Sequence, residues 1–167
     1  MELSIYVASP LGFSEAGRFF YYEKLLPQIT KTGFQVLDPW TLTDPLVIEF
    51  AMSAPEGYEQ RKRWSQVNKT IGRNNEEAIK RCSLVVAILD GPDVDSGTAA
   101  EIGFAVGLEK LVIGYRSDFR LSADNVGSTV NLQVEYFIRK SGGDIVTTLN
   151  ALEEKLCTVH TQTKNHT

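Results

Sequence analysis

The sequence is poor in metal ligands and in positive charge. It contains two cysteines, Cys82 and Cys157, and two histidines, His160 and His166, at no spacing typical of a metal site. We therefore expect no metal and no disulfide framework. Lys and Arg number 17 against 21 Asp and Glu, which gives a net charge of −4, and no basic block is present. A nucleic-acid surface normally shows a Lys/Arg stripe, so we expect no polymer partner.

Long apolar runs are also missing, because no stretch approaches the roughly 20 residues that cross a membrane. The N-terminus shows no signal-peptide pattern, so we expect a cytoplasmic protein with reduced cysteines and no membrane partner. Of the 167 residues, 43% are hydrophobic and 23% charged, which is typical of a globular domain with its own core. We assign residues 1–157 to one domain and expect the polar residues 158–167 to form a disordered tail.

Short apolar runs alternate with helical patterns along the chain. The segments predicted as strands are 3–8, 34–37, 84–89, 111–115 and a short fifth at 133–138. The predicted helices are 15–32, 60–81, 97–109 and 145–156. The run at 84–89 is apolar throughout, as expected of a central strand that is covered on both faces. The alternation predicts a single-domain α/β fold, a doubly wound (flavodoxin-like or Rossmann-like) five-stranded parallel sheet flanked by helices.

Two segments lack a regular pattern, 41–58 and 116–130. Irregular stretches of this length inside a compact domain usually belong to a binding site or a lid. In doubly wound sheets, ligands bind beyond the carboxyl ends of the strands. The segments 9–13 and 90–101, together with Asn131, fall at those ends and are the candidates for chemistry.

Segment 95–103 follows the predicted central strand and opens a helix. Gly97 allows a tight turn, and Ser96 or Thr98 can cap the new helix. Ala99 and Ala100 are small, so a ligand can approach closely. Glu101 then lies in the first or second turn, where the helix dipole stabilises an ionised carboxylate by about 0.3–1 kcal/mol when exposed. An ionised carboxylate can act as a nucleophile. On spacing alone, Glu101 can equally be an acidic residue that only decorates the first turn.

Four motifs in one order resemble the signature of the nucleoside 2-deoxyribosyltransferase family. They are Ile5-Tyr6, Leu89-Asp90-Gly91, the segment 95–103 and Asn131-Leu132, and the similarity spans roughly residues 3–138. The resemblance implies an enzyme that exchanges the bases of 2′-deoxyribonucleosides without a cofactor. A glutamate attacks the anomeric carbon, expels the base and holds a covalent deoxyribosyl group, which a second base removes. Glu101 takes this role, and the chemistry is that of retaining glycoside transfer.

The same resemblance assigns roles to three further residues. Tyr6 corresponds to a tyrosine that hydrogen-bonds the nucleophile, and Asp95 to an aspartate near the substrate. Asn131 corresponds to an asparagine that a neighbouring subunit contributes to the sugar 5′-hydroxyl, which implies a homo-oligomer. The alternatives are a core aromatic for Tyr6, a turn or cap residue for Asp95, and a helix or turn cap for Asn131.

One position departs from the family pattern. Members usually carry an aspartate 26 positions before the nucleophile, which serves as general acid to the leaving base; here 101 − 26 = 75, and the residue is Asn75. An asparagine can recognise a base but cannot deliver a proton, and general-acid help is typically worth 10²- to 10⁴-fold. We expect protonation by water or by Glu76 and a shifted balance of transfer against hydrolysis. Alternatively the register is off by one residue.

Aromatic residues near the carboxyl ends of the strands are candidates for the base pocket. Phe13, Trp40 and Trp64 offer the flat faces that nucleobases favour, and each can also serve only in packing. Expected partners are deoxyribonucleosides and free nucleobases.

Two competing functions stay open. The first is a 2′-deoxynucleoside 5′-monophosphate N-glycosidase, for which Ser9 and Ser96 could contact phosphate. Relatives of that kind carry a Ser-Ile-Arg-Gly-Gly-like loop after the first strand, whereas this chain has Ser9-Pro10-Leu11-Gly12-Phe13 and lacks the Arg. The second is a non-catalytic nucleoside-binding module, which Asn75 favours.

Overall fold

The computed structural model describes residues 3–165, the last of them by its backbone alone. It contains one five-stranded sheet in the order β2-β1-β3-β4-β5, and every pair of neighbouring strands is parallel. The strands are β1 (Ser4–Ala8), β2 (Gln35–Leu37), β3 (Leu84–Ile88), β4 (Leu111–Tyr115) and β5 (Ile145–Val146). The predicted α/β class and parallel sheet are confirmed. In this order the chain reverses direction across the sheet between β1 and β3, where flavodoxin-like folds bind their ligands.

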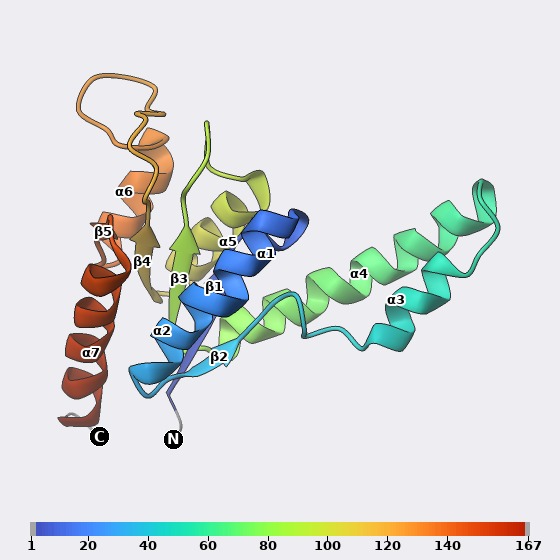
Figure 1. Ribbon diagram of the computed structural model, residues 1–167, viewed down its shortest axis with the longest axis horizontal. Coiled ribbons are helices and arrows are strands. Elements are labelled where there is room, and N and C mark those ends of the chain that lie inside the picture. The colour runs from blue at the N-terminus through green and yellow to red at the C-terminus, as the bar shows by residue number, and fades with distance from the viewer. Residues whose placement is uncertain (1–2, 166–167) are drawn as a thin grey trace.

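Helices cover both faces of the sheet (Figure 1). The first stretch comprises the 3-10 turn η1 (Leu11–Phe13), α1 (Glu15–Phe20), the π-helical turn η2 (Tyr21–Leu25) and α2 (Leu26–Lys31). The later helices are α3 (Pro45–Met52), α4 (Tyr58–Arg81), α5 (Ser96–Gly107), α6 (Leu132–Lys140) and α7 (Leu149–Asn165). Helix α4 confirms the helix predicted at 60–81, and α5 the one at 97–109.

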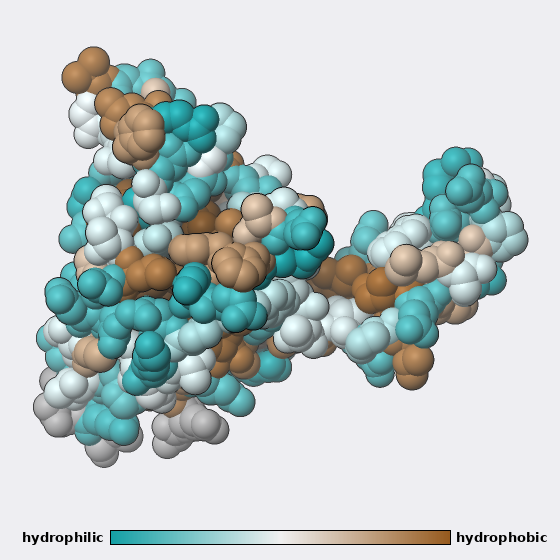
Figure 2. Space-filling model, viewed as in Figure 1, coloured by the Kyte–Doolittle hydropathy of each residue, from teal (hydrophilic) through white to brown (hydrophobic). Residues whose placement is uncertain are grey.

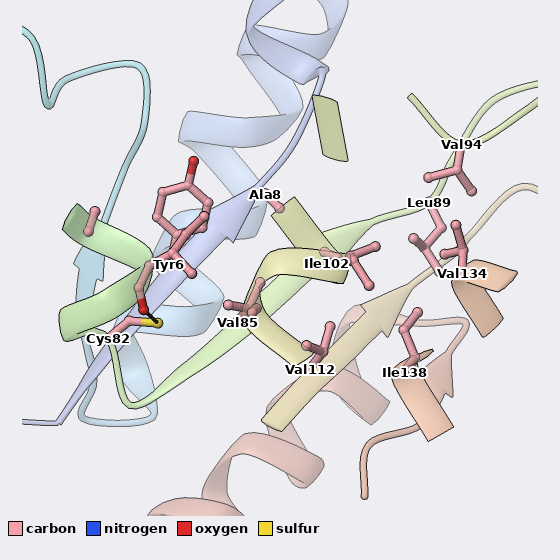
Figure 3. Packing of buried hydrophobic residues seen from close by; sticks show 14 of the residues in the cluster. Tyr6, Ala8, Cys82, Val85, Leu89, Val94, Ile102, Val112, Val134 and Ile138 are labelled. Carbon is pink, nitrogen blue, oxygen red and sulfur yellow. Dashed lines mark hydrogen bonds between the residues drawn. The ribbon is translucent and has the colours of Figure 1, made fainter. Parts of the chain in front are cut away.

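Side chains alternate between two cores, one on each face of the sheet. Tyr6, Val85 and Val112 face the core that is completed by Ile102 of α5 and Ile138 of α6 (Figure 3). The neighbouring strand residues face the second core, against η2, α2 and α7; they are Ile5, Val7, Val86, Ile88 and Ile113. Because successive side chains of a strand point to opposite faces, this two-sided burial explains the unbroken apolar run of β3.

The C-terminal third differs from the sequence-based prediction. Residues 133–138, predicted as the fifth strand, belong to α6, where Val134 and Ile138 lie four residues apart and share a buried helix face. The fifth strand is Ile145–Val146, at the start of the predicted helix 145–156, and pairs with Gly114 and Tyr115. Two residues are too short a run to show a strand pattern.

The predicted disorder of the tail is wrong for residues 158–165, which continue α7. The ring of His160 packs edge-on against Phe34, with 4.9 Å between centroids. Earlier in α7, Leu152 and Leu156 are fully buried in the core. A polar helix end that keeps a few such contacts stays helical. His166 lies outside the described residues.

Residues 41–58, predicted to be irregular, contain α3. Asp44 caps this helix by accepting a hydrogen bond from the Leu46 amide (2.9 Å), and Pro45 occupies the first turn, where its missing N–H costs nothing. Helix α3 packs antiparallel to the outer half of α4, and the pair projects from the body (Figure 1). We call residues 45–75 the helical arm. In the space-filling view, hydrophobic atoms line the arm where it meets the body (Figure 2).

The loop 116–130 has no helix or strand, as predicted. Hydrogen bonds in both directions join the start of this loop to the residues that follow β3. The fully buried Arg116 donates from Nη1 to the Leu89 carbonyl and from Nη2 to the Gly91 carbonyl (3.3 Å). In return, Asp90 accepts hydrogen bonds from the amide (2.6 Å) and hydroxyl (2.8 Å) of Ser117. Among the described helices, none has the length and apolar character to cross a membrane.

Candidate active site

A cavity of about 640 Å³ lies between the carboxyl edge of the sheet and the helical arm. Its wall on the sheet side consists of Ser9, Asp95, Gly97, Thr98 and Glu101. The loops after β1 and β2 contribute Phe13, Pro39, Trp40 and Thr43, and the arm contributes Ile48, Trp64, Asn68, Ile71 and Asn75. The structure thus brings together eight residues singled out in the sequence, namely Ser9, Phe13, Trp40, Trp64, Asn75, Asp95, Gly97 and Glu101.

Glu101 lines the sheet side of this cavity, and its partner Tyr6 is fully buried outside the lining. The Tyr6 hydroxyl donates a 2.6 Å hydrogen bond to Oε1 of Glu101, across 95 residues of sequence. Burial raises the pKa of the Glu101 carboxyl, the bond from Tyr6 counteracts this rise, and the nearby Asp95 charge adds to it. Burial, followed by the Glu101 charge, raises the pKa of Tyr6 far above its usual value. Tyr6 is therefore a permanent hydrogen-bond donor that favours the ionised form of Glu101.

Asp95 caps helix α5, as the alternative for this residue predicted, and Ser96 and Thr98 do not. Its Oδ2 accepts hydrogen bonds from the amide (2.9 Å) and the hydroxyl (3.2 Å) of Thr98. A Cβ on Gly97 would lie 3.1 Å from the same oxygen, so glycine leaves room for the cap. Asp95 also lines the cavity, and capping a helix does not prevent its other oxygen from facing a ligand.

Phe13 and Trp40 form an aromatic wall. Their rings meet edge to face at 4.8 Å between centroids. Gly12 makes this possible, because a Cβ at that position would overlap the Trp40 indole. Phe13 is 75% exposed and Trp40 37%, so both rings keep surface free for a planar ligand.

Sequence reasoning missed Asp38, which holds this wall in place. The buried Asp38 accepts a hydrogen bond from the Trp40 amide (3.0 Å) and from the hydroxyls of Tyr21 (2.9 Å) and Tyr22 (3.3 Å). The Asp38-Pro39-Trp40 turn was visible in the sequence, but its partners in η2 were not. Ile48 and Ile71 were missed for the same reason, since they join the cavity only through the folding of the arm.

Asn75 lines the cavity and Glu76 does not. Glu76 pairs with Lys80 at 2.6 Å on the exposed side of α4, about 100° away around the helix. Of these two neighbouring residues, Asn75 is therefore the one that borders the cavity. Glu76, expected as a substitute proton donor, is turned away from the site.

Asn131 is absent from the cavity wall of its own chain. Its Oδ1 accepts hydrogen bonds from the amides of Gln133 (3.0 Å) and Val134 (3.4 Å) and so caps α6. Among the described residues, the lining contains two carboxylates, Asp95 and Glu101, and no Lys or Arg. Nowhere in residues 3–165 do three His, Cys, Asp or Glu side chains cluster as metal ligands would. Fold and cavity define an α/β protein with a carboxylate site at the carboxyl edge of a parallel sheet.

Comparisons with known proteins show the family of the chain. The model of the family described as nucleoside 2-deoxyribosyltransferase matches residues 5–133. Since this covers most of the chain, the protein belongs to the nucleoside 2-deoxyribosyltransferase family, whose enzymes act on N-glycosidic bonds. A comparison with curated protein sequences gave no match.

Solved structures share the fold at low sequence identity. A 2-desoxiribosyltransferase from Leishmania mexicana is 20% identical with a TM-score of 0.65, over 95% of this chain and 99% of that one. A 2-deoxyribosyltransferase from Bacillus psychrosaccharolyticus is 24% identical with a TM-score of 0.56, over 90% of each chain. A CMP N-glycosidase from Clostridium botulinum, BcmB, is 18% identical with a TM-score of 0.54, over 92% and 97%.

Proposed function

We propose that this protein transfers 2-deoxyribose between nucleobases by double displacement, with Glu101 as the nucleophile. The observation that carries the proposal is the 2.6 Å hydrogen bond from Tyr6 to Oε1 of Glu101 at the wall of a ligand-sized cavity. It holds one carboxylate oxygen and leaves Oε2 for attack. Family membership supports the reaction class.

The first displacement forms a covalent intermediate. Oε2 of Glu101 bonds to C1′ as the C1′–N bond breaks, and the bonding electron pair leaves with the base. The transition state resembles an oxocarbenium ion, which the carboxylate stabilises before bonding to it. In the second displacement a ring nitrogen of another base bonds to C1′ as the C1′–Oε2 bond breaks. The bonding electron pair returns to the Glu101 carboxylate, and the N–H proton of the incoming base passes to water. Attack by water at that point gives hydrolysis.

Other cavity residues have supporting roles in this proposal. Asp95, Ser9 and Gly97 border the sugar, while Phe13 and Trp40 offer the exposed surface of their aromatic wall to the base. Asn75 contacts the base but cannot protonate it. Because Glu76 faces away from the cavity, the proton for the leaving base comes from water. The balance of transfer and hydrolysis is therefore set by how well the acceptor base excludes water from C1′.

A second copy of the chain completes the site in this proposal by donating Asn131 to the sugar 5′-hydroxyl. The exposed apolar side chains near Asn131 favour a covered surface there. They are Phe119, Leu121 and Val126 of the loop 116–130 and Leu132 and Tyr136 of α6. Asn131→Ala should raise KM for the nucleoside, and mixing it with Glu101→Gln protein should restore sites that have both residues intact.

The competing N-glycosidase function has a weaker basis in the cavity. A 5′-monophosphate carries up to two negative charges, and the part of the lining that the structure describes offers two carboxylates and no cation. Ser9 Oγ accepts a hydrogen bond from the Leu11 amide (3.1 Å), so the loop after β1 is closed on itself. Charge repulsion therefore favours an uncharged nucleoside.

One pair of incubations tests the proposal. The protein is mixed with deoxyinosine and adenine, and separately with a deoxynucleoside 5′-monophosphate alone. Deoxyadenosine in the first supports base exchange, and sugar phosphate in the second supports the glycosidase. Silence in both supports a binding module. Intact-mass spectrometry of protein quenched with deoxyinosine should show one added deoxyribosyl group; its absence during active exchange would overturn Glu101 as a covalent nucleophile.

A further inference from the structure

Two neighbouring asparagines of α4 have opposite environments. Asn74 donates from Nδ2 to the Leu42 carbonyl (3.3 Å) and to Oγ1 of Thr43 (3.0 Å), so it ties the loop before α3 to α4. Asn75 borders the cavity, and its Oδ1 is shielded from solvent without a hydrogen-bond partner among the described residues. Asn74 is thus a structural residue, whereas the acceptor of Asn75 is unused.

An unused buried acceptor destabilises the free protein. Leaving one unpaired typically costs about 1–3 kcal/mol, and most such groups in native proteins have a partner. Because Oδ1 of Asn75 has no hydrogen bond to break within the described residues, the carboxamide can turn toward a ligand without losing one at this atom. A ligand N–H that reaches Oδ1 therefore gains the bond at little cost, while a ligand that opposes it with another acceptor gains nothing.

The carboxamide offers an acceptor and a donor side by side. On a departing purine, negative charge spreads onto the imidazole ring, so the useful place for the Nδ2 donor is N7. The neighbouring group is then the substituent at C6. In adenine that group is an amine, and N6–H with N7 forms the bidentate pair with asparagine that proteins use to recognise adenine in DNA. In hypoxanthine and guanine it is a carbonyl, which faces Oδ1 acceptor to acceptor.

We propose that Asn75 makes this site select 6-aminopurine nucleosides over 6-oxopurine nucleosides. The inference rests on the proposed function for the placement of the base, and it names the class of base that the site takes. A family aspartate at this position supplies a proton; the asparagine of this chain supplies a fixed donor–acceptor pair instead. In this proposal Asn75 provides no acid catalysis but discriminates between bases by the group at C6.

Binding to the Glu101→Gln protein tests the selection without turnover. Titration calorimetry should give an affinity for deoxyadenosine about 10- to 100-fold above that for deoxyinosine. This is the usual discrimination that a bidentate hydrogen-bonded pair gives against the wrong base. 7-Deaza-2′-deoxyadenosine keeps the amine but lacks the N7 acceptor, and should fall between the two. When Asn75→Leu is added, which keeps the branching at Cγ but has no polar atoms, the ratio of the two affinities should fall to near one.

Asn68→Leu is the matched control, because Asn68 lies on the same helix and the same cavity wall two turns away. It should change both affinities by the same factor and keep their ratio. Two results would overturn the inference. One is equal affinity of the Glu101→Gln protein for deoxyadenosine and deoxyinosine, and the other is an unchanged ratio of these affinities after Asn75→Leu is added. Base exchange by the parent without such a ratio defeats the inference alone. Selective binding without any deoxyribosyl adduct in the parent defeats the proposed function alone.

Discussion

The two walls of the cavity are built from parts of the molecule with very different packing. Glu101 and Tyr6 stand on α5 and β1, and α5 packs against β1, β3, β4 and α6. The opposite wall stands on the helical arm, where α3 packs against α4 and large apolar side chains remain exposed, such as Leu46 (69%) and Tyr58 (75%). One wall is fixed by the core, and the other is attached mainly through one long helix (Figure 1).

This difference assigns separate tasks to the two walls. A nucleophile needs a fixed position and a stable hydrogen bond, which only the core provides. Recognition of a planar base tolerates small movements of the surrounding side chains. We therefore expect substitutions on the sheet side to lower kcat and substitutions on the arm to raise KM.

The largest effect should come from Glu101→Gln. The variant keeps the shape of the side chain but cannot form a stable ester, so kcat should fall on the order of 10⁴- to 10⁶-fold, as for other lost nucleophiles. Base exchange followed by chromatography measures this. Glu76→Gln serves as the control and should keep parental activity, since Glu76 pairs with Lys80 outside the cavity. Exchange by Glu101→Gln at the parental rate would refute the assignment.

Tyr6→Phe should lower kcat by about 10- to 100-fold, because one hydrogen bond to a charged group is worth roughly 1.5–3 kcal/mol. The Tyr6 bond lowers the pKa of Glu101, so its loss raises that pKa. Because Glu101 must be ionised to attack, the acidic limb of the kcat profile should move to higher pH. Tyr58→Phe, an exposed tyrosine on the arm, is the control. An unmoved acidic limb would show that Tyr6 does not act through this carboxylate.

Gly12→Ala should raise KM by about tenfold, because the new methyl group overlaps the Trp40 indole and displaces it, at a typical overpacking cost of 1–3 kcal/mol. We expect kcat to change little, since Glu101 and Tyr6 lie on other elements. Gly72→Ala is the matched control, with open space around its Cβ position. A normal KM in Gly12→Ala would separate the aromatic wall from base binding.

Glu101→Gln should also stabilise the fold near neutral pH. Burial raises the pKa of Glu101 in the folded chain above its usual value of 4.5. The folded state thus binds this proton more tightly than the unfolded state, and its stability falls as pH rises from below 4.5 through the raised pKa. The variant should gain about 0.5–2 kcal/mol at pH 7, a usual gain at strained functional sites. In denaturant titrations the gain should vanish near pH 4; a pH-independent difference would contradict this cause.

The smallest effect should follow Arg63→Ala on the arm. Arg63 donates to the Phe50 carbonyl (3.0 Å), and its guanidinium lies 4.5 Å from the Phe50 ring centroid, so it joins α4 to α3. Its loss should raise KM a few-fold, in line with roughly 0.5–1 kcal/mol for an exposed cation–π contact. Hydrogen exchange in 45–52 should quicken while β1 and β3 stay protected. Lys62→Ala, exposed on the same helix, is the control. Unchanged exchange in α3 would mean that other contacts hold the arm.

Sequence patterns predicted those parts of the fold and site that depend on neighbouring residues. The apolar run of β3 and the segment 95–103 show their structure locally, and both were placed correctly. Helix α3 was missed because it is eight residues long and is held by Arg63, thirteen positions beyond Phe50. The fifth strand was misplaced because Ile145–Val146 is defined by its partner β4.

The site shows the same limit. Asp38 is an ordinary turn residue in the sequence and becomes the support of Trp40 only when Tyr21 and Tyr22 reach it. The sequence does not distinguish Asn74 from Asn75. Only the folded loop at Thr43 shows that Asn74 has a hydrogen-bond partner, whereas Oδ1 of Asn75 has none among the described residues. Contacts between distant segments have no local pattern, so they were outside what the sequence could predict.

The span between Tyr6 and Glu101 has a consequence for how the protein is made. In the folded protein β3 lies beside β1 and α5 packs against both, and this arrangement brings the two side chains together. A partly synthesised or partly refolded chain carries the same glutamate without its phenol partner. Catalytic competence should therefore appear late, together with the finished sheet, and its return during refolding can serve as a signal that the central strands have assembled.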